Sequence, residues 1–173
     1  RLMRAALQKG IKKIYCSAKT SPRSIDEVRI DFLAPDDIAI KDSYNDQSAT
    51  NNNSLVMKLT FGAIQFLFCA DILQDVEHRL VNENVPVEAT IIKVPNHGGV
   101  SSNTEEFIRA VSPQVAVFSC RSYGTLMLPH SDVLDRYRKE GATIYQTDKN
   151  GAIVIETDGT TYQVAPQKKE SDG

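Results

Sequence analysis

The sequence predicts an α/β domain. Segments with strand-like and helix-like patterns alternate from residue 54 to residue 147, which is the order that packs helices against a largely parallel sheet. Two short runs rich in Ile, Val and Phe, before Asp71 and before His97, have the composition of strands buried on both faces. A chain of 173 residues can bury one substantial core, so we expect one domain or part of one.

The first seventy residues are expected to be mostly strands and polar loops. The expected elements are a helix over 2–9, a strand over 11–17, a polar loop over 18–24, a strand over 28–32 and a polar loop over 36–53. Gly10 is expected to end the helix. Alternation of Val28, Ile30 and Phe32 with charged residues predicts that their strand is half-buried. Strands over 55–60 and 63–70 then form a hairpin around Gly62.

From residue 75 onward, helices and strands are expected in turn. The predicted order is a helix over 75–84, a strand over 89–94, a helix after residue 104, a strand over 115–119, a helix over 132–140 and strands over 143–145, 152–156 and 160–164. Ser102 to Glu105 offers a capping box for the second helix, and Ser131 a cap for the third. We expect the domain to cover residues 1–165, with a disordered polar tail over 166–173.

Composition excludes several classes of protein. A net charge of −2 and a pI near 5.9, without a basic helix, disfavour a sequence-specific nucleic-acid binder. No apolar stretch approaches the roughly 20 residues that cross a bilayer. The three cysteines have no CxxC spacing, and Cys69 and Cys120 lie in apolar runs, which favours buried free thiols and a reducing compartment. The chain lacks an initiating Met, so we expect it to start inside a longer protein.

Asp71 and His97 are the leading candidates for a functional site. Each follows a predicted buried strand, and such strands expose their chemistry at their carboxyl ends. A carboxylate and an imidazole, both potential metal ligands, can therefore meet at one edge of the sheet. Two simpler interpretations stay open: Asp71 can cap the following helix, and His97 can be a surface-loop histidine with no function.

Four motifs in order carry a resemblance to a known family. They are Asn52–Val56, then Phe68–Asp71 with Glu77 following, Lys93–Gly99 with Ser101, and Tyr145–Ala152. Together they resemble the carboxyl half of metallo-β-lactamase-fold hydrolases, nearest to the soluble domain of ComEC-type DNA-internalisation (competence) proteins. The resemblance covers residues 1 to about 162. It implies an αββα sandwich whose N-terminal part is missing from this chain, with a two-metal hydrolytic site at its edge.

The resemblance also implies roles for single residues. Asp71 corresponds to the carboxylate that bridges the two metals, and His97 to one of the family's paired histidines. Asn96 replaces the other histidine, and it could bind substrate or a hard cation instead. Further candidates for substrate contact are Ser101, His130 and Asp148, the last with Thr147 at the rim of the site. Helix capping for Ser101 and a simple turn at Asp148 are the alternatives.

The sequence departs from the family pattern at several places. The main metal-binding signature, His-x-His-x-Asp-His, has no counterpart in these residues. Ala70 stands where the family has Gly, and Leu128-Pro129 stands where a His-Pro is common. These departures favour an alternative, a catalytically inactive fold used as a scaffold or binding module.

The leading expectation is a metal-dependent hydrolase of a phosphodiester or related ester, nuclease-like, with DNA among its candidate substrates. Two divalent ions, Zn²⁺ or Mn²⁺, would bind in the intact parent, and this chain alone would be inactive and need not bind any. Sheet strands missing upstream would leave apolar surface exposed, to be covered by the N-terminal half or by self-association. The compartment is cytoplasmic for a free-standing protein and extracytoplasmic for part of a ComEC-type membrane protein.

Overall fold

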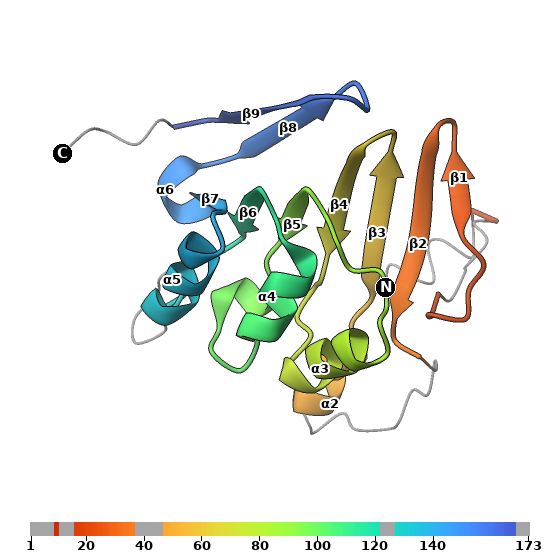
Figure 1. Ribbon diagram of the computed structural model, residues 1–173, viewed down its shortest axis with the longest axis horizontal. Helices are drawn as coiled ribbons and strands as arrows, with labels where there is room; N and C mark the ends of the chain where they lie inside the picture. The colour runs from red at the N-terminus through yellow and green to blue at the C-terminus, as the bar shows by residue number, and fades with distance from the viewer. Residues whose placement is uncertain (1–8, 11–15, 37–46, 122–126, 169–173) are drawn as a thin grey trace.

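The computed structural model describes residues 9–10, 16–36, 47–121 and 127–168, except for the side chains of 47–49. Its main body is a seven-stranded sheet with the strands in chain order, β1 to β7 (Figure 1). The strands are β1 Arg23–Ile25, β2 Val28–Ala34, β3 Val56–Phe61, β4 Ile64–Phe68, β5 Ile91–Lys93, β6 Val115–Phe118 and β7 Thr143–Gln146. β1 to β4 pair antiparallel, whereas β4 to β7 pair parallel.

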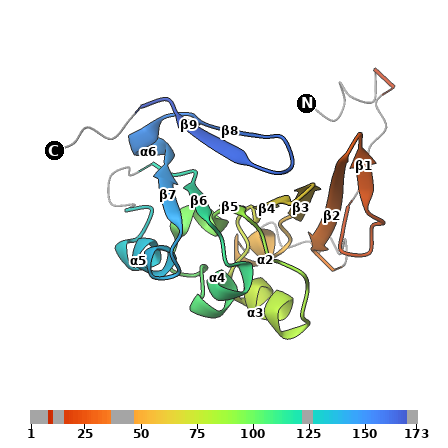
Figure 2. The ribbon, with the colours of Figure 1, turned by 45° about the horizontal axis from the view of Figure 1, so that its top comes forward.

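The parallel half of the sheet is connected through helices, as parallel strands require. The helices of these connections are α3 Gln74–Asn82, α4 Glu105–Val111 and α5 Ser131–Lys139. All three lie on one face of the sheet (Figure 2). Shorter helical segments are α2 Gln47–Asn52, the 3-10 turn η1 Pro95–Gly98, and α6 Thr147–Asn150. No helix in the described ranges has the length and apolar character needed to cross a membrane.

A second, two-stranded sheet covers the opposite face. It consists of β8 Ile153–Thr157 and β9 Tyr162–Pro166, paired antiparallel. It lies above the main sheet, on the side away from the helices (Figure 2). The predicted α/β class is confirmed, and the layers run from helices through the large sheet to the small one.

Side-chain alternation along the parallel strands divides the core in two. Leu67, Ile92 and Ala116 point toward the helices and belong to the main buried cluster, which also holds Phe107 and Tyr137. On the other face, Ile64, Ile91 and Val115 form a smaller cluster, against which Ile155 and Val164 of the second sheet pack. The strands are therefore apolar on both faces, as expected for buried parallel strands.

The two sheets touch at the tips of their hairpins. The backbone N–H of Ala63, beside Gly62, donates to the Gly159 carbonyl at 2.6 Å. Gly62 has a φ of 56°, and a Cβ there would run into the backbone of Gly159. Glycine is required at Gly62 by both its backbone conformation and this close approach.

Several predicted boundaries are wrong. Strand β1 lies partly in the predicted loop 18–24, because Asp26 takes a left-handed φ of 50° and allows a two-residue turn into β2 without glycine. Helix α2 lies in the predicted loop 36–53. Most of the predicted helix over 2–9 and strand over 11–17 falls outside the described residues. β9 continues to Pro166, and the N–H groups of Gln167 and Lys168 donate to the carbonyls of Ala152 and Asn150, while the predicted domain bounds of 1–165 stay a prediction.

Both predicted helix caps are also wrong by one or two residues. Thr104, not Ser102, caps α4 by accepting a hydrogen bond from the Phe107 N–H. Ser102 is buried, and its hydroxyl donates to the Ile72 carbonyl at 2.7 Å. His130, not Ser131, caps α5, because its Nδ1 accepts from the Asp132 N–H at 3.3 Å.

Candidate functional site

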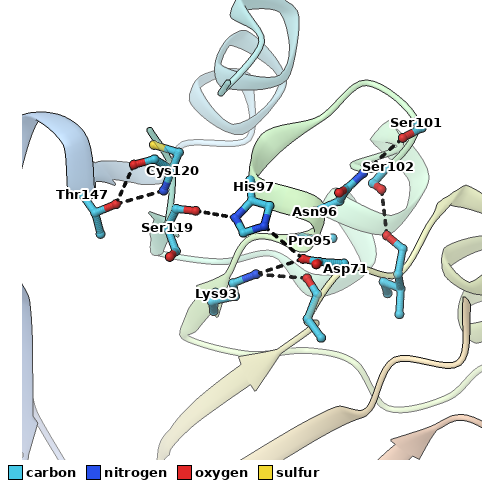
Figure 3. A network of polar contacts seen from close by, with 12 residues as sticks. Asp71, Lys93, Pro95, Asn96, His97, Ser101, Ser102, Ser119, Cys120 and Thr147 are labelled. Atoms are coloured by element: carbon cyan, nitrogen blue, oxygen red, sulfur yellow. Dashed lines mark hydrogen bonds and ion pairs between the residues drawn. The ribbon is translucent and has the colours of Figure 1, made fainter. Parts of the chain in front are cut away.

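Polar groups gather where the four parallel strands end. Asp71 follows β4, His97 follows β5, Ser119 follows β6 and Thr147 follows β7. Since these strands are neighbours and parallel, their carboxyl ends lie along one edge of the sheet. Figure 3 shows the side chains and carbonyls that meet there. The predicted convergence of Asp71 and His97 is therefore observed, whereas their predicted roles remain predictions.

Asp71 and His97 approach each other directly. His97 Nε2 lies 3.5 Å from Asp71 Oδ1, and both side chains are about two-fifths exposed (Figure 3). The other ring nitrogen, Nδ1, lies 2.6 Å from the Ser119 carbonyl oxygen. A carbonyl oxygen only accepts, so Nδ1 must carry a proton and donate. In the neutral imidazole the Nε2 lone pair therefore faces the Asp71 carboxylate, and these two acceptors need a proton or a cation between them.

Helix capping does not explain Asp71. The N-cap position of α3 is Leu73, and no side chain caps that helix. The Leu73 N–H donates instead to Asn52 Oδ1 of α2, at 3.2 Å. The Asp71 carboxylate faces the edge of the sheet, so the simpler interpretation of this residue is wrong.

Lys93 is a member of the site to which the sequence analysis assigned no role. Its Nζ donates to the Ala70 carbonyl at 3.0 Å and lies 3.9 Å from Asp71 Oδ1. Burial lowers the pKa of Lys93, and the nearby Asp71 and Cys69 work against that shift. A charged residue at the end of the apolar run Ile91-Ile92 was the signal that could have identified it.

The loop carrying His97 has an unusual backbone. Asn96, His97 and Gly98 have φ values of 44°, 55° and 84°, all in the left-handed region. Ala70, before Asp71, has a φ of 47°, where glycine is favoured, which explains why the resembling family has Gly at that position. Non-glycine residues in this region cost on the order of 1–3 kcal/mol each and cluster at functional sites.

The Gly98 position allows no side chain. A Cβ there would lie 2.6 Å from Pro129 Cβ and 2.8 Å from the Phe118 ring. The Gly98 carbonyl also accepts a hydrogen bond from the His130 N–H at 3.0 Å. The loop is thus packed directly against the start of the segment that leads into α5.

The other residues predicted to contact substrate are not all close to Asp71 and His97. Asn96 Nδ2 donates to the Ser101 hydroxyl at 3.2 Å, so these two residues form one exposed polar pair beside His97. His130 joins the loop through its backbone, while its Nδ1 is occupied as the cap of α5. Asp148 lies at the β7 end of the rim and accepts a hydrogen bond from the Cys120 thiol at 3.4 Å. No direct contact joins Asp148 or His130 to Asp71 among the contacts of the described residues.

The two thiols near the rim are protonated and buried, which makes them weak candidates for nucleophiles. Burial, with help from the neighbouring Asp148, raises the pKa of Cys120 to about 11. Burial also raises the pKa of Cys69 far above its ordinary range. Both cysteines are free and buried, as predicted, and remain protonated at neutral pH. The Thr147 hydroxyl accepts from the Cys120 N–H and donates to its carbonyl, both at 2.9 Å, which joins β6 to β7.

Asp71 and His97 place two potential metal donors side by side, fewer than a divalent metal needs. No group of three His, Cys, Asp or Glu side chains with suitable geometry occurs in the part of the chain that the structure describes. Protein zinc sites use three or four protein ligands. These residues therefore fit one side of a metal centre and do not complete one.

Comparison with known proteins identifies the relatives of this chain. No protein-family model matches the sequence. It is 28% identical over 167 residues to ComE operon protein 3 of Bacillus subtilis, covering 93% of this chain and 22% of that protein. It is 27% identical over 129 residues to competence protein ComA of Neisseria gonorrhoeae, covering 74% and 18% respectively. The chain is thus similar in sequence to a ComE operon protein and to a competence protein.

Further matches extend this result. The uncharacterized protein YcaI of Escherichia coli is 26% identical over 121 residues, which is 69% of this chain and 16% of YcaI. The chain thus spans about a fifth of the length of its curated relatives. A proposed metal-dependent hydrolase from Parabacteroides distasonis, known from a crystal structure, aligns with a TM-score of 0.52 over 84% of this chain and 61% of that one. At 14% identity this likeness shows the fold alone, a mixed α/β architecture with a large sheet and flanking helices.

Proposed function

We propose that this chain is the carboxyl part of a metal-dependent hydrolase that cleaves a phosphodiester or related ester. The observation that carries the proposal is the facing pair of acceptors at the rim, His97 Nε2 and Asp71 Oδ1, 3.5 Å apart. The Ser119 carbonyl holds the opposite ring nitrogen, which is how proteins fix the tautomer of a metal-binding histidine. A divalent cation satisfies both acceptors at once.

Each residue of the site has a definable task in this proposal. When bound, the metal ions would polarise the ester and lower the pKa of a bound water toward neutrality. Asp71 and His97 would hold them on one side, with the remaining ligands supplied by parts of a longer parent protein. Lys93 would orient the Asp71 carboxylate through the ion pair between its Nζ and Asp71 Oδ1. Asn96, Ser101, His130 and Asp148 are proposed substrate contacts.

DNA is the phosphodiester to test first, since two of the relatives are competence proteins and the motifs resemble those of DNA-internalisation proteins. The intact parent protein, supplied with Mn²⁺ or Zn²⁺, would be assayed on single-stranded DNA and on bis(p-nitrophenyl) phosphate. Asp71→Ala is expected to reduce hydrolysis by at least about 100-fold, since loss of a ligand should exceed the effect of losing one of its supporting partners. His78→Ala, on the exposed side of α3, is the matched control. Unchanged hydrolysis by Asp71→Ala would refute the ligand assignment.

A second candidate function is an inactive scaffold or binding module. It is supported by the Lys93 ammonium, which already places a positive charge 3.9 Å from Asp71, and by Asn96 in place of a histidine. Metal analysis of the purified parent separates the two candidates. A scaffold would contain no stoichiometric metal, and Asp71→Ala would not alter its metal content.

The second sheet supports a further proposal about partners. A cavity of about 230 Å³ lies between β8 and the main sheet, lined by Phe66, Phe68, Ile91, Lys93, Val117 and Ile155 among others. We propose that strands from another part of a longer parent protein, or from a second copy, complete the small sheet and cover this cavity. Such a parent would place the domain outside the cytoplasmic membrane if it is a competence-type membrane protein.

A further inference from the structure

Asn103 lies beneath the loop that carries His97 and is fully buried. Its side-chain Nδ2 donates to the Gly99 carbonyl at 3.0 Å and to the Pro95 carbonyl at 3.3 Å. These two carbonyls are at opposite ends of the loop, on either side of Asn96, His97 and Gly98. One amide group therefore fixes the distance between the two ends.

Every polar group of Asn103 has its own partner. Its N–H donates to the Glu77 carboxylate at 2.6 Å, and its carbonyl accepts from Arg136 Nη1 at 2.8 Å. Its Oδ1 accepts from the Tyr137 hydroxyl at 3.1 Å. Glu77 is itself fully buried and also accepts the Thr104 N–H at 2.8 Å. Helices α3, α5 and the start of α4 thus hold one asparagine in place.

Asparagine suits this position for two reasons. Its φ is 67°, a left-handed value that Asn tolerates better than most residues. Its amide also both donates two hydrogen bonds and accepts one, which is what the two loop carbonyls and the Tyr137 hydroxyl require. Aspartate has the same size and a similar tolerance of left-handed φ, but it would turn a carboxylate toward two carbonyl oxygens.

The loop needs such an anchor because its backbone is strained. The left-handed Asn96 and His97 persist only where surrounding contacts over-determine them. The 2.6 Å contact of His97 Nδ1 with the Ser119 carbonyl depends on that backbone, and so does the orientation of Nε2 toward Asp71. We infer that Asn103 is a positioning residue that sets the ring orientation and tautomer of His97 from the protein interior. The inference rests on the proposed function for its catalytic meaning.

The test is a nuclear magnetic resonance spectrum of the full chain labelled with ¹⁵N-histidine. The chain has three histidines, so the ring nitrogens give few signals, and His97→Gln assigns the one of interest. In the wild type, His97 is expected to show a protonated Nδ1. Asn103→Asp and Asn103→Gly remove the two donated hydrogen bonds while tolerating the left-handed backbone. Both are expected to shift His97 to the tautomer mixture of a solvated imidazole and to leave exposed His78 unchanged.

Tyr137→Phe is the matched control, because it removes a partner of Asn103 and leaves the two loop contacts intact. It is expected to retain the wild-type His97 signal even if it lowers stability. A wild-type His97 signal in both Asn103 variants would overturn the inference. A Tyr137→Phe spectrum with the same loss at His97 would also overturn it, because general loosening would then account for the effect.

If Asn103→Asp fails to fold, Asn103→Gly provides the test without a buried charge. The tautomer readout requires neither metal nor turnover, so it is independent of the proposed hydrolysis. In the intact parent, Asn103→Gly is expected to reduce hydrolysis by about 10- to 100-fold, as for other groups that support a metal ligand. A shifted His97 signal with no hydrolysis by the wild-type parent would overturn the proposed function and leave the positioning role intact.

Discussion

The two faces of the main sheet are built from the same strands and are covered very differently. On one face three helices close a core that includes Leu67, Ile92 and Phe118, all without exposure to solvent. On the other face a single hairpin leaves Phe68 37% exposed and a cavity beside it. Strands that are apolar on both faces need cover on both, so we expect a further segment to complete the second face.

The largest expected effect is a difference between two neighbours on β4 that point to opposite faces. Leu67→Ala removes a fully buried side chain from the helix face and is expected to cost about 2–5 kcal/mol of unfolding free energy. Phe68→Ala, on the hairpin face, is expected to cost less than Leu67→Ala because Phe68 is already 37% exposed. Urea denaturation of both variants measures the difference. Equal losses would mean that the second face is as well packed as the first.

A smaller effect is expected on the surface properties of the hairpin face. We expect the isolated chain to bind a hydrophobic dye and to associate with rising concentration, because Phe66 and Phe68 border an open apolar cavity. Phe68→Ser is expected to reduce both, as measured by dye fluorescence and sedimentation velocity. Met127→Ser, which removes an exposed apolar side chain outside the cavity lining, is the control. A monodisperse wild-type monomer without dye binding would contradict the prediction.

The smallest expected effects concern the pH dependence of folding stability. One carboxyl group on each face should contribute to it, with opposite signs. Under the helices, burial raises the pKa of Glu77, and the amides of Thr104 and Asn103 only partly offset it. In the β8–β9 turn, the amides of Thr161 and Thr160 lower the pKa of Asp158. The folded state therefore binds the proton of Glu77 more tightly than the unfolded state does, and that of Asp158 less tightly.

The direction in which each group's contribution to stability changes with pH follows from these pKa shifts. The stability from Glu77 is full below the ordinary glutamate pKa and is lost as pH rises through the raised value, so the advantage of wild type over Glu77→Gln should shrink with rising pH. The stability from Asp158 is present above the ordinary aspartate pKa and is lost as pH falls through the lowered value. The advantage over Asp158→Asn should therefore shrink with falling pH. Denaturation curves at several pH values test both trends, and trends of the same sign would contradict the assignment.

Sequence patterns predicted the parallel half of the fold better than its first strands. The apolar runs before Asp71 and His97 placed both residues at strand ends, and the rule for parallel strands then brought them to one edge. β1 was missed because its turn uses Asp26 rather than glycine. Local patterns also favoured Ser102 as a cap, whereas its hydroxyl bonds the Ile72 carbonyl, thirty positions away in the chain.

The partners of the site residues were beyond sequence reasoning for a similar reason. The group that fixes His97 is the backbone carbonyl of Ser119, and any residue type could supply it. Asn103 appeared only as part of a capping motif, and its role depends on contacts with residues from three different elements. The resemblance supplied the roles proposed for Asp71 and His97, while local periodicity supplied only their positions.

The two sheets are in direct backbone contact at one end of the space between them, beside Gly62 and Gly159. The layers meet backbone to backbone at these hairpin tips, whereas the cavity extends to Phe68 and Lys93, toward the opposite ends of β4 and β5. The cavity between the layers therefore lies away from the glycine contact and reaches Lys93, whose ammonium neighbours Asp71. A segment that filled this cavity would contact Lys93, so we expect its arrival to change the electrostatic environment of Asp71.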